Sequence, residues 1–316
     1  MWPKLTRLLE AKKFFLLPAG AILLFLIFTA GCERSLTVSS TTRDIIRFLI
    51  RDTDGIFSNS FLDTSRAGVA GTDFFFSRNF TVKSLDTAIT LNDLDTINPG
   101  NTIVSKNPRE AGAEIIDTLI GQLRIDSAGS SRPTRNFRLP VTKFGYFQKL
   151  QSDAFPNRGW EVLGATQTFV GIVRILDSVK IIGLNSNRDT LVIRQIRNVN
   201  LAPFSDPQVF KVRTNPFQLK PQDSVEVRAW LRNTSIDSIF HVFCHVNDAS
   251  AKRRIQLTEV APREFFGWFK LSDAPQELYD YRRLVVDVIA NSTLTDPFGS
   301  FYNEIWGIIY QVHPLQ

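Results

Sequence analysis

Hydrophobic and polar positions alternate in the second half of the chain as they do in β-strands. The clearest case is the segment from Asp223 to Arg232, in which Val225, Val227, Ala229 and Leu231 are separated by polar or aromatic residues. A period of two residues places these four side chains on one face of a half-buried strand. Further segments have the length and spacing of short strands in a β-sandwich. They are Ile172 to Ile182, Thr190 to Ile196, Val209 to Arg213, Ile239 to Val246, Arg254 to Val260, Glu264 to Leu271, Arg283 to Asn291 and Phe301 to Val312.

The first half of the mature sequence begins with a helical pattern. Thr41 can cap this helix, Asp44 lies three residues further on, and apolar residues follow at helical spacing from Ile45 to Ile50. The turn sequence Asp52-Thr53-Asp54-Gly55 is expected to end the helix. Strands separated by turn residues should follow it. They are Thr72 to Lys83, Ala113 to Ile125, Asn136 to Leu150 and Gly159 to Val170.

These patterns predict a mostly β protein with two folded domains. Residues 41–169 should form an α+β domain, with a helix and an antiparallel curved sheet, and residues 170–316 an Ig-like β-sandwich. The sequence Gly159-Trp160-Glu161-Val162 resembles the start of the final strand in the cone-shaped nuclear transport factor two-like superfamily. That resemblance covers residues 41–168 and implies a fold used by enzymes and binding domains alike. An unrelated α+β domain with Trp160 in its core is the alternative.

The turn Pro221-Gln222-Asp223 resembles the one that opens an early strand in many bacterial Ig-like domains. The Cys…Trp…Cys core of antibody domains is missing from this chain, so the resemblance concerns the general architecture.

The N-terminus has the layout of a targeting segment. Basic residues between Lys4 and Lys13 precede an apolar stretch from Phe14 to Phe28, and Ala30-Gly31-Cys32 follows. This layout resembles a bacterial lipoprotein signal, in which the cysteine sulfur takes a diacylglycerol and the peptide bond before it is cut. The resemblance implies that residues 1–31 are a signal peptide, that Cys32 is lipidated and that residues 32–40 form a short tether.

The same resemblance implies a location in the bacterial cell envelope, with the membrane bound through the N-terminal lipid. Buried methylenes contribute about 0.8 kcal/mol each, so two or three acyl chains anchor a protein firmly. Glu33 follows the cysteine, where lipoproteins held at the enterobacterial inner membrane carry Asp, and this difference favours the outer membrane. An uncleaved signal anchor and an ordinary secreted protein are the alternatives, and the anchor would give the same topology.

Removal of residues 1–31 changes the charge that matters for binding. Four basic residues and Glu10 leave with the signal, so the formal net charge falls from +6 to +3. So small a charge on a chain of this length gives no electrostatic footprint for nucleic acid. Cys244 becomes the only free thiol, and no intramolecular disulfide can form.

The remaining candidate residues point to no catalytic, cofactor or metal site. His241 and His245 lie four residues apart on a predicted strand, so they share a face but stand about 13 Å apart, too far to chelate one metal ion. We expect a sheet-surface pair beside a buried Cys244 on the opposite face. The sequence contains none of the common motifs of zinc proteases, serine hydrolases, phosphate-binding loops or dinucleotide-binding folds.

Two kinds of cluster remain open to a binding role. Lys252-Arg253-Arg254 and Arg282-Arg283 could contact lipid headgroups or anionic glycans, although solvated turn and edge-strand charges explain them more simply. The run Phe265-Phe266-Gly267-Trp268-Phe269 has aromatic residues on both faces of a strand. Such a strand lies between two layers or presents an exposed patch, and exposed patches mark interfaces.

Three functions from different classes are compatible with these features. The first is a non-catalytic envelope module that binds an envelope protein or polymer. The second is a small-ligand binder or enzyme with a pocket in the N-terminal α+β domain, around the strands of Tyr146 and Trp160. The third is a purely structural assembly subunit. The absence of a catalytic motif favours the first.

Overall fold

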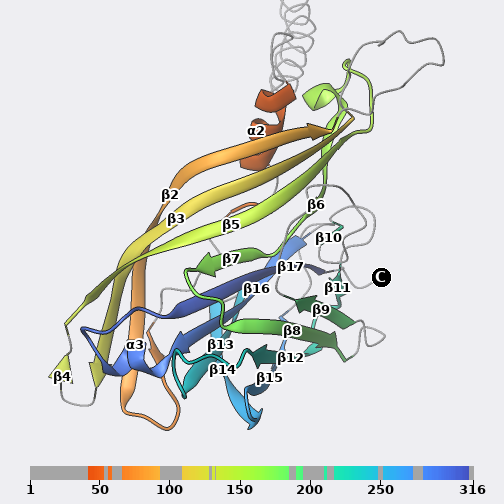
Figure 1. Cartoon of the computed structure of the whole chain (residues 1–316). Helices are drawn as coiled ribbons and strands as arrows, with labels where there is room; N and C mark the ends of the chain where they lie inside the picture. Colours follow the sequence, from red (N-terminus) through yellow and green to blue (C-terminus); the bar gives the residue numbers. More distant parts are fainter. Residues whose placement is uncertain are drawn as a thin grey trace, which may run out of the picture. The chain divides into compact units, whose positions relative to one another are not determined.

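The computed structural model describes residues 42–52, 56–58, 66–92, 109–127, 130–131, 133–184, 190–194, 210–211, 217–247, 252–272 and 280–312. The chain divides into two compact units, Met1–Ser40 and Thr41–Gln316, and every described residue belongs to the second unit. This unit is mostly β, as the sequence predicts (Figure 1). The predicted signal, Cys32 and the tether to residue 40 lie outside the described residues.

The unit begins with helix α2 (Thr42–Asp52), which buries Ile45, Ile46 and Leu49. The helix ends at Asp52, where the predicted turn sequence begins. In the described ranges no helix is long and apolar enough to cross a membrane.

Three long antiparallel strands follow the helix. Phe74 pairs with Ser127 at one end of the first hairpin and Asn92 with Glu110 at the other, so the first two strands stay in contact over their whole length. The third strand pairs along the second from Gln148 to Arg135. The three strands are β2 (Phe74–Asn92), β3 (Glu110–Ser127) and β5 (Arg135–Lys149).

The segment predicted as one strand, Gly159 to Val170, forms two strands in the structure. They are β6 (Trp160–Ala165) and β7 (Thr168–Gly171), and both pair with β5. Strand β7 also pairs with β17 (Asn303–Val312), near the end of the chain. Hydrogen bonding therefore continues across the predicted boundary between residues 169 and 170, and neither a division there nor a separate sandwich is confirmed.

Three strands in the middle of the unit are buried on both faces: β13 (Phe240–Asn247), β16 (Asp280–Ala290) and β17. Every side chain of β17 is buried. One face of this group packs against the long strands, with Phe76 of β2 edge-on to Phe243 of β13 at 5.2 Å between ring centroids. This shared core contains Val69, Phe76, Leu119, Leu123, Ile125, Phe137, Leu139, Val141, Val170, Phe243, Val285, Ile289, Leu294 and Ile305.

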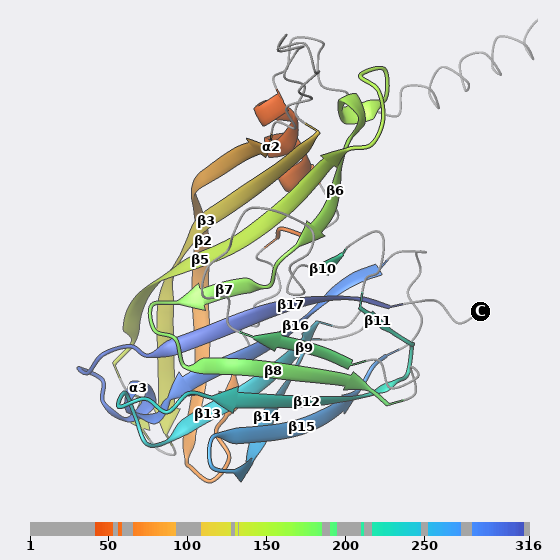
Figure 2. The ribbon, with the colours of Figure 1, turned by 45° about the vertical axis from the view of Figure 1, so that its right-hand side comes forward.

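A set of paired strands with one half-exposed face completes the architecture (Figure 2). Its strands are β8 (Leu176–Gly183), β9 (Thr190–Arg194), β12 (Ser224–Leu231) and β15 (Glu264–Lys270), paired in the order β9, β8, β12, β15. The alternation predicted for β12 is confirmed, because Val225, Val227, Ala229 and Leu231 are buried while the residues between them are half-buried. Strand β14 (Lys252–Ala261) pairs with both β13 and β15 and so joins this set to the central strands.

The remaining described elements are short. They are β1 (Ala67–Gly68), β4 (Ser130–Ser131), the 3-10 helix η1 (Pro156–Gly159), β10 (Phe210–Lys211), β11 (Gln218–Leu219) and helix α3 (Asn291–Thr295). Strand β11 pairs in parallel with β17, whereas the other pairings described are antiparallel.

Candidate functional site

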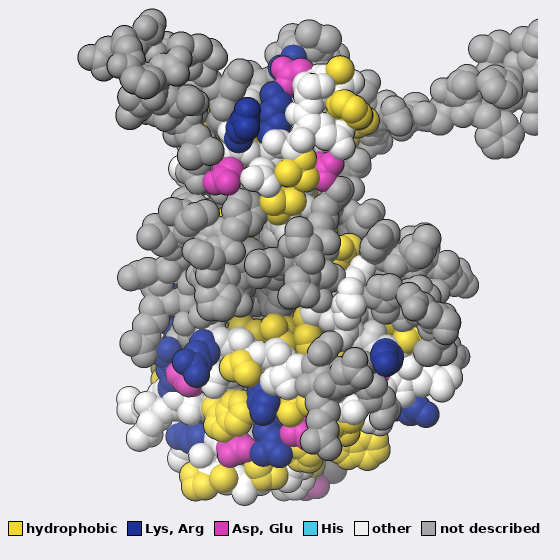
Figure 3. Space-filling view, turned by 90° about the vertical axis from the view of Figure 1, so that its right-hand side faces the viewer, with side chains coloured by type: hydrophobic (Ala, Val, Ile, Leu, Met, Phe, Trp, Pro, Cys, Tyr) yellow, Lys and Arg dark blue, Asp and Glu magenta, His cyan; other side chains and the backbone are white. Residues whose placement is uncertain are grey.

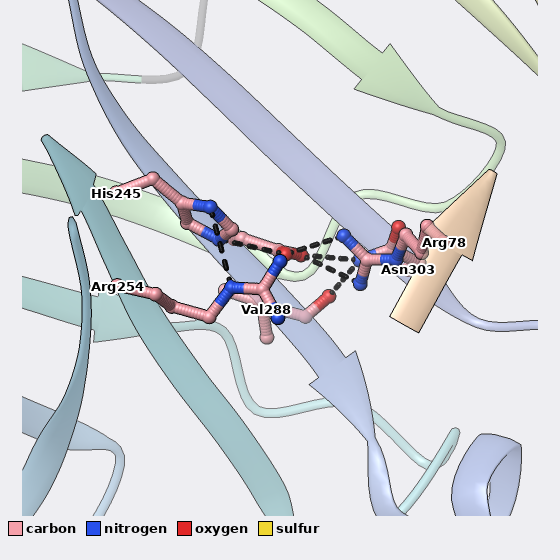
Figure 4. A network of polar contacts seen from close by, with 6 residues as sticks. Arg78, His245, Arg254, Val288 and Asn303 are labelled. Carbon is pink, nitrogen blue, oxygen red and sulfur yellow. Dashed lines mark hydrogen bonds and ion pairs between the residues drawn. The ribbon is translucent and has the colours of Figure 1, made fainter. Parts of the chain in front are cut away.

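Asp287 on the central strand β16 is the centre of a buried polar network, and its partners Arg78, His245 and Asn303 are labelled in Figure 4. Arg78 of β2 donates to both carboxylate oxygens, at 2.5 Å from Nη1 and 3.2 Å from Nη2. Asn303 of β17 donates from Nδ2 to Asp287 Oδ1 at 2.7 Å and to the Val288 carbonyl at 2.7 Å. Each partner comes from a different strand, so the network links the long sheet to the central strands.

His245 of β13 completes the network, and its two hydrogen-bond partners fix its tautomer. Arg254 Nε donates to His245 Nδ1 at 3.5 Å, so the proton of the neutral ring lies on Nε2, which donates to Asp287 Oδ2 at 3.1 Å. The guanidinium carbons of Arg78 and Arg254 lie 5.2 and 5.0 Å from the centroid of the Phe76 ring, close enough for cation–π attraction.

Burial and charge have opposite effects on these groups. Burial alone would raise the pKa of the Asp287 carboxyl, but Arg78 and the His245 hydrogen bond outweigh it and hold that pKa well below its ordinary 3.8. Burial lowers the pKa of His245 below 6.5, although Asp287 opposes the shift. The site therefore holds an ionised carboxylate beside a neutral imidazole. Because both ring nitrogens have partners inside the network, we interpret His245 as a structural link between strands.

The expectation of a sheet-surface histidine pair was wrong. His241 is 7 % exposed and His245 is 3 % exposed. Both are buried because β13 is covered on both faces, so the strand has no solvent face on which they could lie. His241 bonds through Nε2 to Asn291 Oδ1 at 3.1 Å, away from the Asp287 network. Cys244 is buried, as expected, and burial raises the pKa of its thiol.

A second buried polar cluster lies between β3, β5 and β16. Lys143 Nζ is 3.2 Å from Asp117 Oδ2 and also donates to the Phe57 carbonyl. Arg283 donates to the carbonyls of Ile56 and Ser58. Burial lowers the pKa of Lys143 to about 8, against the effect of Asp117, and that of Arg283 to about 9. These side chains fasten the turn of residues 56–58 to the sheet.

A third buried group fastens β17 to the start of β8. Glu304 accepts hydrogen bonds from the backbone N–H groups of Ile175 and Leu176, and from Trp306 Nε1 at 2.8 Å. Burial raises the pKa of this carboxyl, while the hydrogen bonds act against the rise.

The simpler explanation of the basic clusters, as solvated charges, is therefore wrong for several of their members. Arg282 and Arg283 are buried, and Arg254 belongs to the Asp287 network.

Sequence reasoning missed Asp287, although an aspartate inside the apolar run Leu284 to Ala290 is a signal that a buried partner exists.

The described surface also presents an aromatic face, which we define as Trp230 of β12 with Phe266 and Trp268 of β15. Trp268 is 63 % exposed, whereas Phe265 and Phe269 point to the opposite side and are buried. The run of residues 265–269 thus forms an exposed patch rather than a strand between two layers. Figure 3 shows hydrophobic side chains interspersed with basic and acidic ones at the level of these strands.

Arg228 lies within the aromatic face and is held in place. It donates to Glu226 at 2.7 Å and to Glu264 at 2.9 Å, and its guanidinium carbon lies 5.1 Å from the Phe266 ring centroid. The cross-strand register places Arg228 opposite Phe266 and Glu226 opposite Trp268. The polar groups of this face are therefore paired with each other beside an exposed indole.

The other positions considered from the sequence give no assembled site. Tyr146 and Trp160 are each 2 % exposed and belong to the core. Among the described residues, no group of three or more His, Cys, Asp or Glu side chains could hold a metal ion.

A scan against family models matched none, and neither the curated proteins nor the solved structures included a match to this chain.

Proposed function

We propose that this protein is a lipid-anchored cell-envelope protein that acts as a non-catalytic binding or assembly module. The observation that carries the proposal is the aromatic face. Tryptophan and arginine are enriched among the residues that dominate binding energy at protein interfaces. Trp268 is 63 % exposed next to a pre-oriented Arg228, so a partner that covers it gains apolar burial with little ordering cost.

The anchor in this proposal is a lipid on Cys32, followed by the tether to residue 40, with the outer membrane as the location. Its support is the signal-like layout of residues 1–32. We also retain the finer fold assignment as part of the proposal, with a cone-like domain over residues 41–169 and an Ig-like sandwich over 170–316. The two share a core and are therefore not expected to unfold independently. The sandwich assignment is supported by the set of four strands paired in the order β9, β8, β12, β15, which forms a layer in addition to the central strands.

The anchor is tested by the intact mass of membrane-extracted protein, wild type beside Cys32→Ala. We expect wild type to weigh residues 32–316 plus acyl chains, and the variant to remain unlipidated. Unprocessed, unlipidated masses for both, differing only by the substitution itself, would refute the lipid anchor.

Binding is tested with the full-length, detergent-extracted protein immobilised and exposed to purified envelope proteins and cell-wall polymer. We expect Trp268→Ala to weaken the affinity for one bound component about 30-fold, the effect of removing a central anchor residue. Phe155→Ala is the matched control, because Phe155 is 52 % exposed but lies in the turn before η1. Equal losses for both variants, or no loss for either, would refute a role for the aromatic face.

A further inference from the structure

The segment between α3 and β17 presents the most exposed large hydrophobic side chain of the described residues. Phe298 is 91 % exposed, although hydrogen bonds hold the backbone on both sides of it. A fully exposed phenylalanine forgoes about 1.5–3 kcal/mol of burial energy. Single exposed apolar side chains are common on protein surfaces, so what distinguishes Phe298 is the ordered backbone that carries it.

Arg135 of β5 holds the segment from beneath. Its side chain donates to three backbone carbonyls: Thr293 at 2.6 Å, Asp296 at 2.9 Å and Gly299 at 2.5 Å. Arg135 itself is only 8 % exposed. A buried guanidinium with three carbonyl partners fixes the path of the backbone on both sides of Phe298.

Further contacts fix the conformation locally. Asp296 Oδ1 accepts from the Phe298 N–H at 3.0 Å, and Thr293 Oγ1 both donates to the Tyr302 carbonyl and accepts from its N–H. Phe301, three residues after Phe298, stacks on Phe137 with ring centroids 5.1 Å apart. The chain thus packs one phenylalanine inward and holds the other outward in an ordered segment.

The position and charge of the segment indicate which kind of partner it fits. The chain enters the compact unit at α2, and α3 lies at the opposite end of that unit in both ribbon views (Figures 1 and 2). Phe298 follows α3 and so belongs to the end of the unit opposite α2. If the lipid is on Cys32, a point that rests on the proposed function, the chain continues to its anchor from the α2 end. Residues 291–302 contain no Lys or Arg and one exposed carboxylate, Asp296, which disfavours an anionic lipid surface.

We propose that Phe298 is a pre-ordered anchor that inserts into an apolar pocket of a second envelope protein, whose basic rim pairs with Asp296. Ordering of the segment by Arg135 lowers the entropic cost of this contact, because the backbone is already held in place before a partner binds. This surface is separate from the aromatic face and involves none of its residues.

The test is photo-crosslinking in the full-length protein in its native envelope, with benzoylphenylalanine in place of exposed Ser300. We expect one discrete adduct with another protein, and its loss when Phe298→Ser is added. The same crosslinker at Phe155, which is 52 % exposed in the turn before η1, should not form that adduct. With the adduct partner purified, Phe298→Ala should weaken binding about 30-fold or more, and Phe155→Ala should leave it unchanged.

Three results would overturn the proposal: an adduct with lipid, an adduct with a second copy of this chain, or an adduct that persists at equal yield in Phe298→Ser. The melting temperature of Phe298→Ala should equal that of wild type, which separates lost binding from lost folding. Failure here with success of the Cys32 and Trp268 tests would leave the proposed function intact. An unlipidated Cys32 together with a Phe298-dependent adduct would refute the lipid anchor and leave Phe298 as a binding residue.

Discussion

Asp287 shows how a single buried charge can hold strands from distant parts of the sequence together. Its side chain is fully buried, and its partner Arg78 is 209 residues away along the chain and 4 % exposed. Removing one member of a buried ion pair leaves an uncompensated charge in a medium that solvates it poorly. The contribution of the network is therefore best measured by substituting its centre.

We expect Asp287→Asn to lower the free energy of unfolding by about 3–5 kcal/mol, because Arg78 would keep its burial and lose its carboxylate. Urea denaturation followed by tryptophan fluorescence measures this change. Asp44→Asn is the control, since Asp44 and its partner Arg47 are each 49 % exposed and such pairs contribute at most about 1 kcal/mol. A loss for Asp287→Asn no larger than that of the control would show that the network is not stabilising.

The histidine in the same network predicts a pH dependence. Burial holds the pKa of His245 in the folded chain below 6.5, so in the range just below 6.5 the unfolded chain binds more protons. The free energy of unfolding should therefore fall as the pH drops through about 6.5, by up to about 1.4 kcal/mol per pH unit for this proton. His245→Gln should flatten that part of the profile when urea titrations are compared between pH 5 and 8. An identical slope in the variant would assign the acid sensitivity to other groups.

Two glycines in the long strands differ in what a methyl group would meet. A Cβ at Gly121 of β3 would collide with the backbone carbonyl of Asn79 on β2, and it would lie 2.8 Å from Phe80 Cβ. A Cβ at Gly145 of β5 would meet only side chains, at 2.8 Å from Phe57 Cζ and 2.9 Å from Phe147. Side chains can shift, whereas a paired backbone cannot shift without losing its ladder.

We accordingly expect Gly121→Ala to destabilise the protein more than Gly145→Ala, for which overpacking costs about 1–3 kcal/mol. Amide hydrogen exchange should show increased opening along β2 and β3 in Gly121→Ala, and near residues 56–58 in Gly145→Ala. The opposite order of stabilities would mean that β2 can move aside.

The sequence predicted the strands themselves in both settings, but it predicted which side chains are buried only where one face of a strand is exposed. In β12 the period of two residues is visible, since polar and apolar neighbours face different media. In β13 and β16 both faces are buried, so His241, His245 and Arg283 follow no alternation and were assigned to the surface. Their partners are separated from them by long stretches of chain, and pairing over such distances leaves no local pattern. For residues 265–269 the sequence left two outcomes open, because aromatic residues on both faces of a strand show no alternation of apolar and polar positions.

At the scale of the whole described unit, the hydrogen-bonded sheet and the core cross the predicted domain boundary. Strand β7 pairs with β5 on one side and with β17 on the other, and the shared core takes side chains from β2, β3, β13 and β16. Elements that share a core unfold together.

We therefore expect the unit Thr41–Gln316 to unfold in one calorimetric transition, with equal van't Hoff and calorimetric enthalpies. Phe76→Ala removes a fully buried ring at the contact with Phe243. It should lower the free energy of unfolding by about 3–5 kcal/mol and move the whole transition to lower temperature. Two transitions, of which Phe76→Ala moves only one, would instead support independently folding domains divided near residue 169.

The burial of Cys244 has a practical consequence for every surface experiment described above. Its sulfur lies inside a strand covered on both faces, and its raised pKa leaves almost no thiolate at neutral pH, which is the form that reacts with maleimides. With Cys32 removed or lipidated, a fluorescent maleimide would have no native target in the folded protein. A cysteine introduced at Ile172, Trp268 or Phe298 can then be labelled selectively, with the native Cys244 left in place.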